Sequence, residues 1–256
     1  MGSSIKQESS IKQDPAQSAA PAGKFFDWQR TSRLTFSREM VTMTVGVDKD
    51  AQEFLVHEEL ITHLQARLFI DVRMSRVGDG PLKGYFGVYQ QLQPEVFIGL
   101  LHFAYHGKLF RETSLDTLWH LYIYAENYRL VDFQDILMNR IVSTYKNSRP
   151  SIFPNSRHMQ LGYNRTGENS AARRFLTKCY AHLLNRNTKS PARPVCYNEI
   201  LADAAKNADG LLLDTLNLMK WKGTTYNAEW DPRDASPCLY HHHALGTKCP
   251  NFQESA

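Results

Sequence analysis

The chain has 256 residues, of which 42% are hydrophobic and 22% charged, a composition typical of globular proteins and unlike that of disordered or membrane-spanning chains. Thirty basic and 26 acidic residues leave a formal net charge of +4, which is too small to indicate a nucleic-acid-binding surface. The first twenty residues are polar and lack the apolar stretch of a secretory signal, so we expect a cytoplasmic or nuclear protein with reduced cysteines.

Residues 1–34 are predicted to form a disordered N-terminal tail, because the first 24 are rich in Ser, Gln, Ala and Pro and nearly free of large apolar residues. The sequence Ser-Ser-Ile-Lys-Gln occurs at residues 3–7 and again at 9–13, and each copy is followed by an acidic residue. This pattern resembles SUMO acceptor sites and makes Lys6 and Lys12 candidate modification sites. The alternative is a solvated linker whose repeat has no role.

Two strands and a turn are expected next. Apolar and polar residues alternate from 41 to 47, as in a half-buried strand. The alternation returns at Phe54 and Val56 after a short turn-forming segment, which predicts a β-hairpin. Residues 85–89 indicate a further strand, whereas the polar, Gly-rich stretch 71–84 gives no clear element.

Helices follow the strands. Apolar residues at helical spacing predict helices over 57–69, from Pro94 to a stop at Gly107, over 115–127 and over 132–145. Because strands come first and helices then follow one another, the sequence favours the α+β class, with a small sheet covered by helices.

Three blocks of residues, in this order, resemble the BTB (POZ) domain family over residues 37–145. They are Phe-Leu-Val-His-Glu-Glu-Leu at 54–60, Pro-Glu-Val-Phe at 94–97 with Leu-Leu-His-Phe-Ala-Tyr-His-Gly-Lys-Leu at 100–109, and a helix ending Ala-Glu-Asn-Tyr-Arg-Leu at 125–130. The resemblance implies a BTB/POZ fold over residues 35–146. It also implies a protein–protein interaction module that is no enzyme and acts by homodimerisation or by recruiting a partner.

Candidate interface residues lie on the helix after Gly107, which carries Trp119, Tyr122, Tyr124 and Tyr128. Aromatic side chains dominate interface energetics, so we expect this group to contribute to a partner surface. The alternative is that the aromatic rings pack in the core of the chain itself.

Residues 147–230 are predicted to form a helical extension. Tyr-Asn-Arg-Thr at 163–166 and Ser-Ala-Ala-Arg-Arg-Phe at 170–175 resemble a segment that follows the BTB domain in a lineage abundant in filamentous fungi. Ser170 is the expected N-cap of a helix. The apolar stripe of this helix consists of Ala172, Phe175, Leu176, Cys179 and Leu183.

A second function that the resemblance implies is a substrate adaptor of a cullin-type ubiquitin ligase. The family usually has a small Ser three residues before a Phe after its first helix. Here Ala66 precedes Phe69, and a long loop follows. This departure argues against a cullin as the partner.

The C-terminal tail, residues 231–256, holds candidate metal ligands. Cys238, His241, His243 and Cys249 have the spacing C-x2-H-x-H-x5-C, and thiolate and imidazole are the donors that zinc prefers. A structural zinc would hold together a tail that is too small to fold alone. The alternative is a solvated histidine run with two free thiols.

A third function would combine this zinc with a modest basic cluster that includes Arg173, Arg174 and Lys178, giving a zinc-stabilised nucleic-acid or chromatin-associated regulator. Such clusters are usually solvated faces, and the sequence does not favour nucleic acid as a partner. We find no nucleotide-binding or catalytic motif and predict no catalytic residue, no certain cofactor and no membrane partner.

Overall fold

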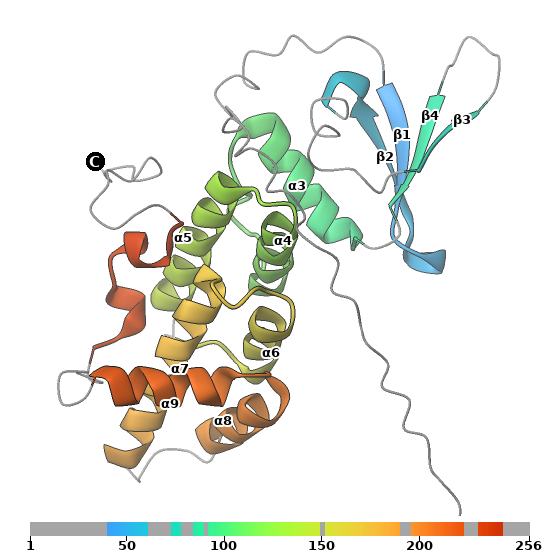
Figure 1. Cartoon of the computed structure of the whole chain (residues 1–256). Helices are drawn as coiled ribbons and strands as arrows, with labels where there is room; N and C mark the ends of the chain where they lie inside the picture. Colours follow the sequence, from blue (N-terminus) through green and yellow to red (C-terminus); the bar gives the residue numbers. More distant parts are fainter. Residues whose placement is uncertain are drawn as a thin grey trace, which may run out of the picture.

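The structure, a computed structural model, describes residues 40–60, 73–77, 84–89, 92–148, 152–189, 196–222 and 230–242. Strands lie at one end of the molecule and a cluster of helices at the other (Figure 1), which confirms the predicted α+β class. Within the described residues, no helix is long and apolar enough to cross a membrane. Lys6 and Lys12 lie outside these ranges.

Among the described residues, the sheet has four strands in the order β2-β1-β4-β3. Strand β1 (Met40–Val45) pairs antiparallel with β2 (Gln52–His57), which confirms the predicted hairpin. On its other side, β1 pairs parallel with β4 (Gly84–Tyr89). Strand β3 (Arg73–Val77) pairs antiparallel with β4. A short 3-10 helix, η1 (Asp48–Asp50), lies in the hairpin turn. Gly46 precedes it with φ of 97°, a conformation that favours glycine.

In the described part of the chain, three helices follow the sheet, and the first of them has the start and the stop that the sequence predicts. Helix α3 (Pro94–His106) begins with proline and ends at Gly107, whose φ is 64°. In α4 (Leu115–Asn127), the Ser114 hydroxyl accepts a hydrogen bond from the backbone N–H of Thr117. Helix α5 is somewhat longer than predicted (Val131–Asn147). Figure 1 places α3 between the sheet and α4.

The described part of the extension contains the helices α6 (Ser156–Asn164), α7 (Ala171–Lys189), α8 (Cys196–Asn207) and α9 (Leu211–Lys222). Ser170 caps α7 as predicted, since its hydroxyl accepts a hydrogen bond of 3.1 Å from the Ala172 N–H. The predicted stripe of α7 is buried: Ala172, Phe175, Leu176, Cys179 and Leu183.

The core continues across the expected end of the first domain at residue 146. Trp119 on α4 and Tyr145 on α5 are fully buried, and both pack against His158 on α6. The Tyr145 hydroxyl bonds to His158 Nδ1 at 2.7 Å, and His158 Nε2 donates to the Asp116 carboxylate at 3.1 Å. Helices α3 to α7 therefore share one buried core rather than two cores joined by a linker.

The C-terminal segment 230–242 folds back onto α5 and α7. It contains two short 3-10 helices, η3 (Pro232–Asp234) and η4 (Pro237–Tyr240). The Arg233 guanidinium lies 3.7 Å from the centre of the Phe153 ring and donates to the Ile152 carbonyl at 2.7 Å. Tyr240 is buried against Phe175. Protein contacts thus attach this part of the tail.

Candidate functional site

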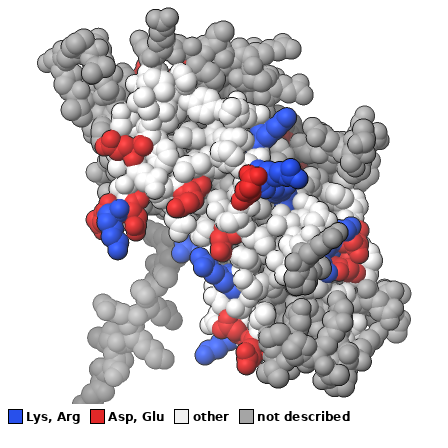
Figure 2. All heavy atoms as spheres, turned by 180° about the vertical axis from the view of Figure 1, so that it is seen from behind, with Lys and Arg blue, Asp and Glu red and all other residues white. Residues whose placement is uncertain are grey.

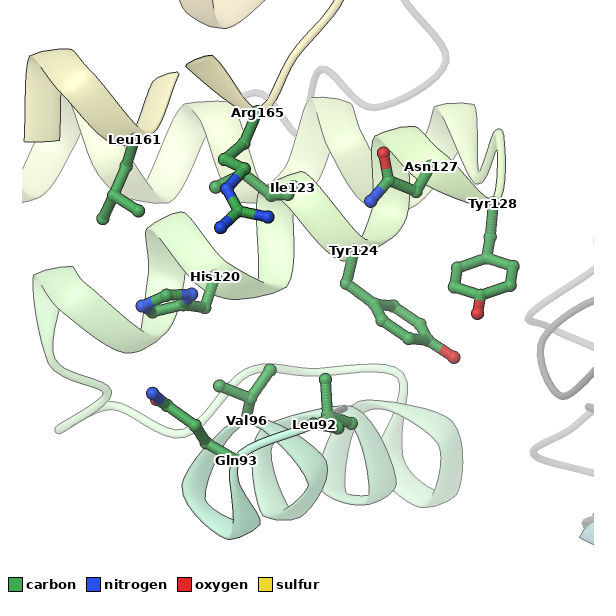
Figure 3. A pocket seen from close by; sticks show the side chains of 10 residues that line it. All are labelled: Leu92, Gln93, Val96, His120, Ile123, Tyr124, Asn127, Tyr128, Leu161 and Arg165. Carbon is green, nitrogen blue, oxygen red and sulfur yellow. The ribbon is translucent and has the colours of Figure 1, made fainter. Parts of the chain in front are cut away.

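A recess of about 300 Å³ opens between the start of α3, one face of α4 and the end of α6. Its lining mixes apolar, aromatic and polar side chains from segments that lie far apart in the sequence (Figure 3). The lining residues are Leu92, Gln93, Val96, His120, Ile123, Tyr124, Asn127, Tyr128, Leu161 and Arg165.

Local structure explains how these side chains meet. His120, Ile123, Tyr124 and Asn127 recur at the spacing of one helical face on α4. On the α3 side, the backbone carbonyl of Gln93 accepts hydrogen bonds from the backbone N–H groups of Val96 and Phe97. Arg165 stands at the C-cap of α6, and Figure 3 shows its guanidinium extending toward the space above His120.

The recess has an apolar wall and an aromatic side. Val96 is buried at its base, while Ile123 and Leu161 are half-buried. The rings of Tyr124 and Tyr128 pack with their centres 4.5 Å apart and bound the opposite end (Figure 3). A surface with this combination of apolar and aromatic groups can bury a partner's side chain, which is the main source of free energy in protein association.

The polar groups give the recess a positive character. Its described lining residues include one permanent cation, Arg165, and no carboxylate, and the Arg165 guanidinium has no ion pair with a described residue. Burial lowers the pKa of His120 below 6.5, and the charges of Arg157 and Arg165 lower it further, while Asp116 opposes them. His120 is therefore neutral at pH 7 and can hydrogen-bond, and Arg165 supplies the charge that would attract an anionic group.

The predicted interface residues divide into two pairs. Trp119 and Tyr122 are fully buried, so the expectation that they form a partner surface is wrong. Trp119 donates to Tyr145, and the Tyr122 hydroxyl lies 3.2 Å from that of Ser170. Both side chains point into the core because they share a helical face with Leu118. Tyr124 and Tyr128 line the recess, and their role in partner binding stays a prediction.

Sequence reasoning missed Arg165 and the half-polar face of α4. One usable signal was present, since His120, Ile123 and Asn127 lie three and four residues apart, on a face that includes neither Leu118 nor Leu121. Nothing in the sequence pattern showed that α6 would place Leu161 and Arg165 beside that face.

The candidate zinc ligands are only half covered by the structure. Cys238 is half-buried, and His241 is buried with Nε2 2.7 Å from the Asn139 side-chain oxygen. Among the described residues, no three His, Cys, Asp or Glu side chains form a group that could hold a metal ion. His243 and Cys249 lie outside them. The bond to Asn139 gives His241 a structural role that needs no metal.

The basic residues on α7 make contacts within the chain. Arg173 donates to the Thr166 carbonyl at 2.9 Å, Arg174 donates to the His241 carbonyl at 3.1 Å, and the Lys178 ammonium lies 5.3 Å from the centre of the Tyr240 ring. On the face shown in Figure 2, basic and acidic side chains of the described residues are interspersed. These arrangements favour the interpretation of the cluster as structural.

Comparison with known proteins adds no family to these observations. The chain matches no protein-family model, and a search of curated proteins finds no relative.

Proposed function

We propose that the chain is a non-enzymatic protein–protein interaction module of the BTB type, which recruits a partner or associates with itself. The BTB type is inferred from the sequence resemblance alone, whose three blocks of residues begin on β2, on α3 and in α4. The single observation that carries the proposal is the recess, which combines apolar walls, two packed tyrosines and the Arg165 guanidinium, a cation that has no ion pair with a described residue.

The size of the recess determines what it can accept. A volume of about 300 Å³ is at the lower end of the range for small-molecule sites. It suits one or two side chains of a peptide better than a nucleotide or another large cofactor. Burial of an apolar side chain against Val96, Ile123 and Leu161 would supply affinity.

A carboxylate near that apolar side chain would add specificity. The Arg165 guanidinium can form two parallel hydrogen bonds with a carboxylate, and such charge-assisted bonds are stronger than neutral ones. The proposed partner segment is therefore a peptide with a large apolar residue next to Asp or Glu. No contact described above favours the zinc-dependent regulator or the cullin adaptor over this function.

The partner can be found by photo-crosslinking from the recess. A photoreactive amino acid at the exposed position Asn127 should crosslink a protein in the chain's own cells. The crosslinked peptide of that protein should contain the apolar and acidic residues.

Binding of the purified partner is then measured for variants of the recess. Leu161→Asp should weaken binding at least about tenfold because it places a charge in the apolar wall. Arg165→Glu should act in the same direction through repulsion.

A matched control is Val131→Asp, which changes an exposed apolar residue that does not line the recess. It should bind the partner as the unaltered chain does. Equal affinity for the unaltered chain, Leu161→Asp and Arg165→Glu, with all three folded by circular dichroism, would refute the assignment of partner binding to the recess.

A further inference from the structure

Helix α9 presents large apolar side chains to solvent. Leu212, Leu213, Leu216 and Met219 are 43%, 62%, 54% and 39% exposed, respectively. On the other side of the same helix, Leu211 and Thr215 are fully buried. A helix on the surface of a monomer normally has one apolar stripe, directed to the core. A second, solvent-facing apolar stripe indicates a surface that another molecule covers.

A shallow depression adjoins this stripe. Small residues from α8 and from the connection to α9, namely Ala205, Ala208 and Gly210, surround it together with Leu212, Leu213 and Leu216. Its volume is about 470 Å³. Figure 1 shows α8 and α9 together at the end of the helical cluster that is remote from the sheet. The surface thus has protruding leucines beside a hollow lined by small residues, and it can accept leucines like its own.

Two charges flank the stripe, one at each end of α9. Asp209, which also lines the depression, precedes the helix, and Lys220 lies near its C-terminus. Both are exposed, and neither side chain has an ion pair with a described residue. Lys220 lies four residues after Leu216 and seven after Leu213, so it shares their face. The surface is therefore negative at one end, apolar in the middle and positive at the other end.

This distribution of charge along α9 favours a second copy of the chain as the partner. If α9 packs against α9 of a second copy in antiparallel orientation, Asp209 of each copy faces Lys220 of the other, and Leu213 faces Leu216 across the two-fold axis. A parallel arrangement would place like charges together. The antiparallel one also brings opposite ends of the two helix dipoles together, and a closed two-fold contact is the commonest form of self-association.

We propose that two copies of the chain form an isologous dimer through antiparallel α9 helices, with leucines of each copy entering the α8–α9 depression of the other. The contact is short, because a helix of 12 residues is about 18 Å long. The buried area therefore lies toward the low end for stable dimers, and we expect a dissociation constant in the micromolar range. The surface shares no residue with the recess, so the dimer and partner recruitment can be tested separately.

Sedimentation equilibrium of the full chain across a concentration series tests the dimer. The unaltered chain should pass from monomer to dimer. Leu213→Glu combined with Leu216→Glu should raise the dissociation constant at least about tenfold, since it places carboxylates at the centre of the apolar contact. The control is Leu55→Glu, which alters an exposed leucine on β2, far from α9 in the sequence, and should leave the dimer unchanged.

Charge exchange tests the orientation. Asp209→Lys alone and Lys220→Asp alone should each weaken the dimer about fivefold or more, because each places like charges together twice in the two-fold contact. The chain with both changes should regain most of the affinity, since the pairs reform with reversed signs. Matching circular dichroism and thermal unfolding of all variants shows that the fold is kept. A chain that stays monomeric, a dimer that resists the double leucine change, or a failure of the charge exchange to restore affinity would overturn the proposal.

Discussion

The indole Nε1 of Trp119 donates a hydrogen bond of 2.9 Å to the phenol oxygen of Tyr145 in the centre of the core. Both residues are fully buried. Tyr145 accepts this bond and can donate its own proton to Nδ1 of His158, 2.7 Å away. Helices α4, α5 and α6 are thereby joined by a hydrogen-bonded chain of side chains in addition to apolar packing.

The change Tyr145→Phe should lower the free energy of unfolding by about 1–3 kcal/mol, because it leaves the Trp119 N–H and the His158 ring nitrogen buried without a partner. Urea denaturation of the full chain measures the effect. Tyr128→Phe is the matched control, since Tyr128 is only half-buried at the recess and should change stability little. Equal stabilities of Tyr145→Phe and the unaltered chain would contradict the prediction.

Stability should fall as the pH drops below about 6.5. Burial lowers the pKa of His158 below its usual 6.5, while the Asp116 carboxylate opposes this and Arg157 and His120 add to it. Above pH 6.5 the histidine is neutral in the folded and unfolded states. Below 6.5 the unfolded chain takes up the proton first, so the free energy of unfolding decreases, by at most about 1.4 kcal/mol per pH unit for one proton.

Denaturation of the chain and of His158→Gln over a pH series checks this point. In His158→Gln, the free energy of unfolding should depend less on pH than in the unaltered chain. The pH dependence that remains should include the contribution of His120, whose pKa is also lowered by burial. An unchanged slope between pH 6.5 and lower pH in His158→Gln would show that this residue is not the source.

Gly162→Ala should destabilise the contact between α6 and α7. A methyl group at Gly162 would overlap Cδ1 of Leu176 and approach the Trp119 ring to 3.5 Å. We expect a loss of about 1–3 kcal/mol from overpacking, despite the better helix propensity of alanine. Gly167→Ala is the control, because its nearest neighbour would be a Glu126 carboxylate oxygen at an ordinary 3.6 Å. A thermal scan that gives equal melting temperatures for both variants would disprove the packing argument.

Arg233→Ala should detach the C-terminal segment and lower the free energy of unfolding by about 3 kcal/mol. Arg233 is 7% exposed, and its removal leaves the partly buried Asp231 unpaired. Arg233→Lys should recover little, because an ammonium cannot bond Asp231, reach the Ile152 carbonyl and lie flat on Phe153 together. Limited proteolysis measures the detachment, because a detached segment is cleaved between residues 230 and 242. Full protection of the lysine variant would refute this account.

Local signals in the sequence predicted the bounds of α3 well. The proline that opens this helix and the glycine that ends it act within one helical turn, so they could be recognised without the rest of the fold. Strand β3 was missed because residues 73–77 contain two arginines and a serine. Pairing with β4, rather than the pattern of this segment, makes it a strand.

The candidate site was harder to predict because it is assembled from distant segments. Helical periodicity predicted the helix over 115–127, and its apolar residues Leu118, Leu121 and Ala125 are buried. It could not show whether Trp119 and Tyr122 would face a partner or the core, since aromatic rings suit both environments. Arg165 follows Asn127 by more than thirty residues, and only the docking of α6 beside α4 places them in one recess.

The position of the recess has a consequence for shortened forms of the chain. An N-terminal fragment that ends between α5 and α6 would keep Tyr124 and Tyr128 but lose Leu161 and Arg165. The recess would then lack one wall and its permanent positive charge. It would also expose the Trp119 and Tyr145 rings that α6 covers. Partner binding at the recess would then require α6 to be present and docked. A truncated or incompletely folded copy would expose aromatic rings that favour aggregation, and it would lack the residues proposed to recognise the partner.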